Sequence, residues 1–236
     1  MAVMNITSLT KKYPSGVVAI DNFTLNVADG ESVAIFGLDR SGKSTLLRVL
    51  AGLEPATDGQ ITLDGRDITY LSSKDRNMAY AFRDTALDNN ADVFGNLAYG
   101  LRKRKVAEEV IEVKVKAVAE ILGLTELLTR KPKVLTALQR RRVALGRTIV
   151  RDPGVFLFDD PLSGLDGELR AQTVSDLVKL QTRLGATYIY ATDDIAEAFT
   201  IGSRVAILSQ GKLVQVDTPE NLFKHPVNDF VAEVTG

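Results

Sequence analysis

The sequence predicts an α/β protein with a mixed sheet core, an antiparallel β portion near the N-terminus and an inserted helical subdomain. An apolar run at residues 32–36 leads through a glycine-rich loop into a helical pattern from Thr45, which predicts a strand followed by a helix. Residues 3–9 and 17–27 alternate apolar and polar side chains, as half-buried strands do. Residues 92–150 instead repeat apolar side chains at helical spacing and contain no convincing strand.

Shorter patterns predict the remaining elements. The run at 155–158 is apolar throughout, which is typical of a parallel strand buried on both faces. Strands are also expected at 60–63, 78–82, 188–191 and 205–208, a helix at 166–184, and a last helical pattern that ends at Gly236.

Size and composition exclude several classes of protein. The 236 residues suffice for one large α/β domain, and 45% of them are hydrophobic, so a sizeable core can form. The 29 basic residues balance 30 acidic ones, which argues against bulk electrostatic binding of nucleic acid. The sequence contains no cysteine, which excludes disulfide bonds and metal sites with thiolate ligands. The first residues lack a signal-peptide pattern, and no run approaches the roughly 20 apolar residues of a membrane span.

The glycine-rich loop matches G-x-x-x-x-G-K-[ST], the phosphate-binding P-loop. Its residues are Gly37, Leu38, Asp39, Arg40, Ser41, Gly42, Lys43, Ser44 and Thr45. Backbone N–H groups and a helix N-terminus together hold phosphate oxygens in such a loop. We expect Lys43 to reach the β- and γ-phosphates of ATP and the Ser44 hydroxyl to bind Mg²⁺. The alternative is a glycine-rich turn that only packs a helix on a sheet.

Two adjacent carboxylates, Asp159 and Asp160, follow the buried strand expected at 155–158. A carboxylate at the carboxyl end of such a strand is typical of the Mg²⁺ side of a P-loop site, which assigns Asp159 to the metal. Burying two neighbouring acids without a cation would be costly. Because Pro161 follows, an aspartate that caps a helix or shapes a turn is the alternative.

The order of these segments resembles the ATPase subunit of ABC transporters, and within that family the carbohydrate importers of the maltose-transporter type. The segments that carry the likeness are the P-loop, the helical insert, Leu135–Gln139, Val155–Asp160, Pro161–Asp166 and Ala191–Asp194. The likeness implies the P-loop NTPase fold of ABC ATPases in a single domain, 1–236. Segments 1–83 and 151–236 would form its nucleotide-binding core and 84–150 its helical subdomain with the signature segment. The regulatory domain that usually follows is expected to be absent or removed, because the chain stops where it would begin.

The resemblance implies an ATP-binding subunit of an importer for a sugar, polyol or similar solute. Two such subunits close on two molecules of MgATP, each held between one P-loop and the partner's signature segment, and closure drives transmembrane permease subunits. The expected partners are those permeases and a second ABC ATPase subunit, identical or different, and no nucleic acid. The expected location is cytoplasmic, peripheral on the inner face of the cell membrane. Thr136 and Gln139 belong to the signature, and Tyr13 matches the aromatic residue that stacks on adenine, unless it only packs at a strand end.

Five positions depart from the active pattern of the family. Arg40 replaces a P-loop glycine, where a positive φ would strain an arginine. Leu138 replaces a signature glycine that lets N–H groups approach the partner's phosphate. Arg83, Asp160 and Asp193 stand where the family has glutamine, glutamate and histidine, and they are the candidate catalytic residues. The Asp160 carboxylate is set back by roughly 1.5 Å, and misplacement by about 1 Å can cost about 100-fold in rate.

These departures affect both halves of the composite site, so we expect attenuated ATP hydrolysis in a homodimer or a heterodimer. The alternative is a non-hydrolysing pseudo-ATPase, a regulatory or structural subunit beside an active ABC ATPase. Arg83 and Asp193 carry opposite charges, and pairing between them would compensate both replacements. The alternative explanation is relaxed selection or an engineered sequence. The basic run Arg102–Lys105 is interpreted as a solvated helix start, with acidic partners as the alternative.

Overall fold

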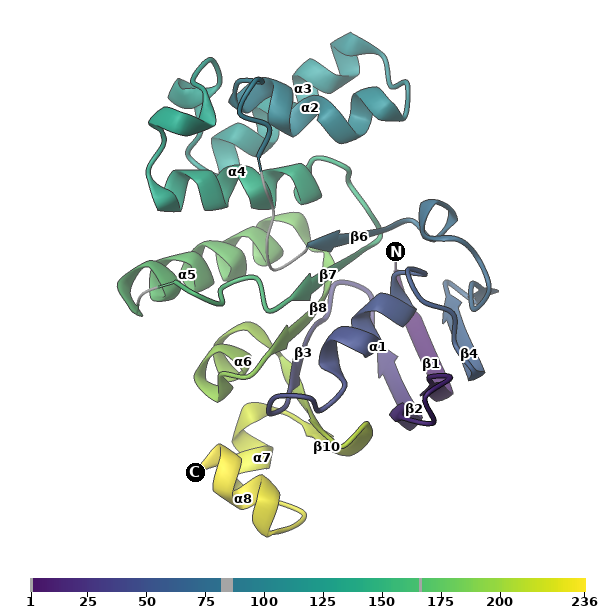
Figure 1. Cartoon of the computed structure of the whole chain (residues 1–236). Helices are drawn as coiled ribbons and strands as arrows, with labels where there is room; N and C mark the ends of the chain where they lie inside the picture. The colour runs from purple at the N-terminus through teal and green to yellow at the C-terminus, as the bar shows by residue number, and fades with distance from the viewer. Residues whose placement is uncertain (1, 82–86, 166) are drawn as a thin grey trace.

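The computed structural model describes residues 2–81, 87–165 and 167–236 of the chain (Figure 1). Two sheets and the helices around them make up these ranges. No helix in the described ranges is both long and apolar enough to span a bilayer.

The larger sheet has the strand order β10-β9-β3-β8-β7-β6. Its strands from β9 to β6 run parallel, and β10 pairs antiparallel with β9. The bounds are Ser32–Phe36 for β3, Met78–Ala81 for β6, Val155–Asp159 for β7, Thr187–Thr192 for β8, Arg204–Ser209 for β9 and Lys212–Asp217 for β10. Because parallel strands end at one edge, the residues that follow β3, β7 and β8 meet there.

The smaller sheet is antiparallel and has the order β2-β1-β4-β5. Its strands are Met4–Lys12 (β1), Val18–Val27 (β2), Asp58–Leu63 (β4) and Arg66–Asp67 (β5). Buried and more exposed residues alternate along β2, so one face of the sheet packs on the core. The antiparallel portion predicted near the N-terminus is therefore confirmed.

Helix α1 (Lys43–Leu50) begins at the P-loop and lies between the two sheets (Figure 1). Leu46, Leu47, Val49 and Leu50 are fully buried in one apolar cluster with side chains from both sheets. Contact on both sides fixes the position of α1, and with it the position of the loop at its N-terminus.

The chain between β6 and β7 is helical where the structure describes it, as the spacing of its apolar residues predicts. These helices share an apolar cluster with β7, β8 and α5. They are α2 (Val93–Lys103), α3 (Glu108–Ile121) and α4 (Ala137–Ile149), with short 3₁₀ turns at Thr125–Leu127 and Pro132–Val134. Outside this segment, a 3₁₀ turn at Ser73–Asp75 precedes β6, and α5 spans Gly167–Leu184.

The C-terminal region contains a strand that the sequence patterns did not predict. β10 is an edge strand whose side chains are mostly half-buried, so its alternation is weak. Gln210 and Gly211, both with positive φ, form the two-residue turn from β9. The predicted helical pattern at the end of the chain is confirmed by α7 (Pro219–Lys224) and α8 (Asp229–Thr235), and α6 (Ile195–Ile201) lies earlier, after β8.

The basic run Arg102–Lys105 lies at the C-terminal end of α2, so its interpretation as a helix start is wrong. Cations at this end are favoured because the last helical carbonyls carry partial negative charge. The run therefore has a local electrostatic reason, and part of it borders the groove described below.

Arg76 ties the far end of α1 to the segment that precedes β6. Its buried guanidinium donates hydrogen bonds of 2.7–2.9 Å to the carbonyl oxygens of Val49, Leu50, Thr69 and Leu71. Val49 and Leu50 belong to the last turn of α1, whose carbonyls have no partner within the helix. Arg76 thus caps α1 and attaches it to β6, the strand that borders both surfaces discussed below.

Candidate functional site

A cavity of about 500 Å³ opens where the P-loop meets the carboxyl ends of β7 and β8. The predicted site residues that line it are Asp39, Arg40, Ser41, Gly42, Lys43, Ser44, Thr45, Asp159, Asp160 and Asp193. Residues far apart in the sequence thus surround one space, as the parallel order of the strands requires.

Two glycines give the P-loop its shape. A Cβ on Gly37 would collide with the Ser41 hydroxyl and with the Leu208 carbonyl of β9. Gly42 has φ +108° and is the N-cap of α1, and a Cβ there would collide with the Ala19 carbonyl. No side chain caps this end of α1, which leaves its first N–H groups available to an anion.

Lys43 supplies a positive charge at the centre of the loop. Its ammonium donates to the carbonyl oxygens of Gly37 and Leu38, the second at 3.1 Å. Burial lowers the pKa of Lys43, and the carboxylates of Asp193 and Asp160 act in the opposite direction. The surrounding aspartates therefore favour the charged lysine that a phosphate group needs.

Arg40 has the positive φ that the sequence predicts for this position, at +61°. This region costs a residue other than glycine about 1–2 kcal/mol. The side chain is exposed at the mouth of the cavity. The loop therefore keeps the backbone shape of a glycine position and adds a cation to the phosphate site.

Asp159 and Ser44 meet at one wall of the cavity, the side that the sequence predicts for the metal. The Ser44 hydroxyl donates to Asp159 Oδ1 at 2.8 Å, and the Tyr80 hydroxyl donates to Asp159 Oδ2 at 2.7 Å. Carboxylate and hydroxyl oxygens are the hard donors that Mg²⁺ prefers, and it binds through one or two protein groups while substrate phosphates complete its ligands. The pair of Ser44 and Asp159 fits this chemistry.

Asp160 and Asp193 add further negative charge. Asp160 is 5% exposed with φ +45°, and its backbone N–H donates to the Ala191 carbonyl at 2.9 Å. Asp193 follows β8 and is exposed at the cavity wall. Together with Asp39 and Asp159, they bring the described cavity lining to four carboxylates, against the cations Arg40 and Lys43.

Tyr13 lies outside the cavity lining. Its hydroxyl donates to Glu54 Oε2 at 2.7 Å and lies 3.4 Å from the Thr45 hydroxyl. The Lys11 ammonium lies 5.0 Å from the centre of its ring. These contacts hold the ring beside the start of α1, and both interpretations of Tyr13 remain predictions.

The signature residues also lie outside the cavity lining. The Gln139 backbone N–H donates to Thr136 Oγ1, and the Thr136 backbone N–H donates to Gln139 Oε1, so the two residues form a capping box at the start of α4. Leu138 is half-buried next to them. Within one chain, the signature and the P-loop are separate surfaces.

Arg83 lies outside the described residues, and so does its predicted pairing with Asp193. Sequence reasoning missed Tyr80. The sequence offers one signal for Tyr80, since it is a tyrosine between two alanines in a short apolar strand. The neighbouring residues in the chain, however, do not indicate that its hydroxyl reaches Asp159.

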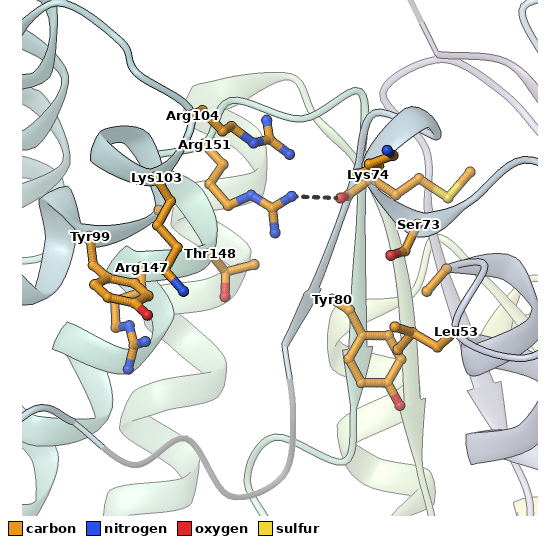
Figure 2. A pocket seen from close by; sticks show the side chains of 13 residues that line it. Leu53, Ser73, Lys74, Tyr80, Tyr99, Lys103, Arg104, Arg147, Thr148 and Arg151 are labelled. Carbon is orange, nitrogen blue, oxygen red and sulfur yellow. Dashed lines mark hydrogen bonds between the residues drawn. The ribbon is translucent and has the colours of Figure 1, made fainter.

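A second hollow, here called the basic groove, has a volume of about 440 Å³ and lies between the end of α1, β6, α2 and α4 (Figure 2). Its basic lining residues are Lys74, Lys103, Arg104, Arg147 and Arg151. The described lining contains no acidic side chain. The basic groove is therefore strongly electropositive.

Two cations of the basic groove make cation–π contacts with one aromatic ring. Lys103 and Arg147 lie 4.8 and 5.7 Å from the centre of the Tyr99 ring. Burial and the nearby charge of Arg104 lower the pKa of Arg151. The repulsion between neighbouring cations would be relieved by an anionic partner.

Comparisons with known proteins agree with this geometry. A model of the ABC transporter family matches residues 20–163. The sn-glycerol-3-phosphate import ATP-binding protein UgpC of Chromohalobacter salexigens is 43% identical over 236 residues. The diacetylchitobiose uptake system ATP-binding protein MsiK of Streptomyces coelicolor is 46% identical over 237 residues. Both alignments cover 100% of this chain but 64% and 63% of the relatives, so the chain spans less than two thirds of their length.

A solved structure supports the fold. The protein cbiO1 from Clostridium perfringens, part of the ABC transporter complex cbiONQ, aligns with a TM-score of 0.86 at 28% sequence identity. The alignment covers 94% of this chain and 90% of that one. The family and the fold class predicted from the sequence are confirmed.

We expect Arg40→Gly to raise the free energy of unfolding by about 0.5–1 kcal/mol, since relief of the left-handed strain exceeds the extra flexibility of glycine. Chemical denaturation measures this change. Asp39→Gly is the matched control, because Asp39 lies in the same loop without a positive φ and should gain nothing. Equal effects of the two substitutions would contradict the strain at Arg40.

Proposed function

Because the chain belongs to the ABC transporter family of ATP-binding domains, we propose that it is the ATP-binding subunit of an importer for a sugar, a polyol or a related solute. Two relatives are named as ATP-binding proteins of sn-glycerol-3-phosphate import and of a diacetylchitobiose uptake system, which supports this class of solute. The single observation that carries nucleotide binding is the P-loop cavity with Lys43, Ser44 and Asp159 together at its wall.

The charge of the cavity supports Mg²⁺ as a companion of ATP. Among the described residues, four lining carboxylates face two cations before any phosphate arrives. Another anion would be repelled unless a divalent cation accompanied it. Ser44 and Asp159 would hold that cation, Lys43 would contact the phosphates, and the open N–H groups of α1 would bind phosphate oxygens.

A dimer would complete the nucleotide site. Thr136 and Gln139 lie outside the P-loop cavity of their own chain, so contact with nucleotide requires the signature of a second subunit. The Thr136 hydroxyl and the Gln139 side-chain amide already accept hydrogen bonds from backbone N–H groups at the start of α4. The side chain of Leu138 adds bulk beside them. We therefore propose that the signature holds the partner's phosphate weakly.

We also propose that ATP hydrolysis is slow, because two residues near the expected γ-phosphate are poorly suited to the reaction. Asp160 is the candidate for orienting water, but its carboxylate is one methylene shorter than a glutamate. Asp193 is an acceptor at a position that would face the γ-phosphate, which is itself an anion. These two placements specifically favour the second candidate function, a subunit that binds nucleotide without hydrolysing it.

The basic groove supports a permease partner with acidic side chains. Its described lining shares no residue with that of the P-loop cavity, so a docked segment would leave the nucleotide site open. Its five cations would attract an acidic segment, and the Tyr99 ring and nearby apolar side chains would bury part of that segment. We place the contact with the membrane subunits here.

Calorimetry should show association of the protein with MgATP. Lys43→Ala should weaken the affinity by about 10- to 100-fold, because a hydrogen bond to a charged group is worth about 1.5–3 kcal/mol. Lys12→Ala, which removes an exposed lysine of β1, should leave the affinity unchanged. Absence of association with the folded wild-type protein would contradict the proposed function.

Asp160→Glu separates slow hydrolysis from none. If the short carboxylate limits the rate, the glutamate should raise phosphate release from MgATP by about 10- to 100-fold, because a gap of roughly 1.5 Å is closed. Lys43→Ala provides the background rate. A rate that stays at this background in both wild type and Asp160→Glu would favour the non-hydrolysing subunit.

The charge of the basic groove predicts its contribution to assembly. The double substitution Lys103→Ala with Arg104→Ala should reduce co-purification with co-expressed permease subunits, and added salt should weaken the wild-type association. The control is Arg102→Ala with Lys105→Ala, which removes the same charge from the same segment outside the groove lining. Equal loss in both double variants would show that overall charge, and not the basic groove, controls assembly.

A further inference from the structure

Tyr80 connects the basic groove with the metal side of the P-loop cavity. Its side chain is among those that line the groove, and its hydroxyl donates to Asp159 Oδ2 at 2.7 Å. Figure 2 shows this hydroxyl pointing away from Lys74 and Arg151. One residue of β6 therefore contacts both surfaces.

The direction of the hydrogen bond to Asp159 follows from its chemistry. A carboxylate only accepts, so the phenol of Tyr80 directs its proton to Asp159 Oδ2. The Tyr80 side chain also packs against the apolar cluster that contains the buried side chains of α1, and this packing holds the hydroxyl in place.

Asp159 thus has one hydroxyl on each oxygen. Ser44 bonds Oδ1 from the P-loop, and Tyr80 bonds Oδ2 from β6. Binding of Mg²⁺ would turn the Ser44 oxygen toward the metal, and the bond from Tyr80 would then be the one that still fixes the rotation of the carboxylate. Groups that orient a ligating carboxylate in this way typically contribute a factor of about 10 to 100 in metal affinity.

We propose that Tyr80 is a positioning residue for Mg²⁺-dependent nucleotide binding, acting through the carboxylate of Asp159. This role rests on the proposed function, because it requires a metal–nucleotide complex in the P-loop cavity. Since the Tyr80 side chain also lines the basic groove, a segment docked there contacts the residue that orients Asp159.

The test is Tyr80→Phe, which keeps the ring and removes the hydroxyl. ADP is titrated by calorimetry over a range of Mg²⁺ concentrations, so that turnover plays no part. We expect the Mg²⁺ concentration for half-maximal gain in ADP affinity to rise at least about tenfold. The affinity for ADP without Mg²⁺ should stay within about twofold of wild type, because Tyr80 lies outside the lining of the phosphate cavity.

Tyr188→Phe is the matched control. Tyr188 lies on β8, and its buried hydroxyl has no hydrogen-bond partner among the described residues. Its removal should leave the Mg²⁺ dependence unchanged, and an equal shift in both variants would overturn the proposal. In the Asp159→Asn background, Tyr80→Phe should have little further effect, and a full additive loss there would also overturn it.

The outcomes separate the inference from the proposed function. If wild type binds ADP with Mg²⁺ dependence and Tyr80→Phe behaves like it, the positioning role is wrong and the proposed function stands. If wild type binds no nucleotide, both are wrong. Thermal unfolding without nucleotide checks that each variant is folded. If Tyr80→Phe does not fold, Asp159→Asn provides the test: an Mg²⁺ dependence of ADP binding equal to that of wild type would overturn the positioning role.

Discussion

Burial of α1 between the two sheets is the contact on which the functional surfaces depend. Leu46, Leu47, Val49 and Leu50 are each fully buried, and such a side chain contributes about 1.5–3 kcal/mol when it leaves water. Arg76 satisfies carbonyls at one end of the helix, while the other end stays uncapped. The helix is thus held firmly by its sides and its C-terminus, and its N-terminus is left free to bind an anion.

The electrostatics of the P-loop cavity follow from where the strands end. β7 and β8 deliver Asp159, Asp160 and Asp193 to the edge at which Lys43 also lies. The carboxylates of Asp193 and Asp160 oppose the lowering of the Lys43 pKa by burial, and among the described lining residues the aspartates outnumber the cations. This excess of negative charge is one reason why we propose that the site binds a metal–nucleotide complex.

Tyr80 of β6 lies between two surfaces with different chemistry. Met78 and Tyr80 point to one face of the strand and line the basic groove, while Ala79 and Ala81 point to the other face and pack with the helices between β6 and β7. The phenol of Tyr80 is long enough to reach Asp159 at the end of the neighbouring strand β7. A single side chain on one face of β6 therefore joins the groove to the P-loop cavity.

The sequence by itself determined the family, the fold class, the strand–loop–helix unit at Lys43 and the placement of Asp159 at a strand end. These features depend on residues that are close in the chain, where spacing alone defines the local structure. Only the tertiary structure decided that Tyr80 reaches Asp159 and that β10 forms an edge of the larger sheet. It also decided that Lys103 and Arg104 lie at the end of a helix and line a groove, where the sequence predicted the start of a helix. Such contacts join segments that no periodicity relates, because packing of the helices on the sheets, and not local spacing, brings them together.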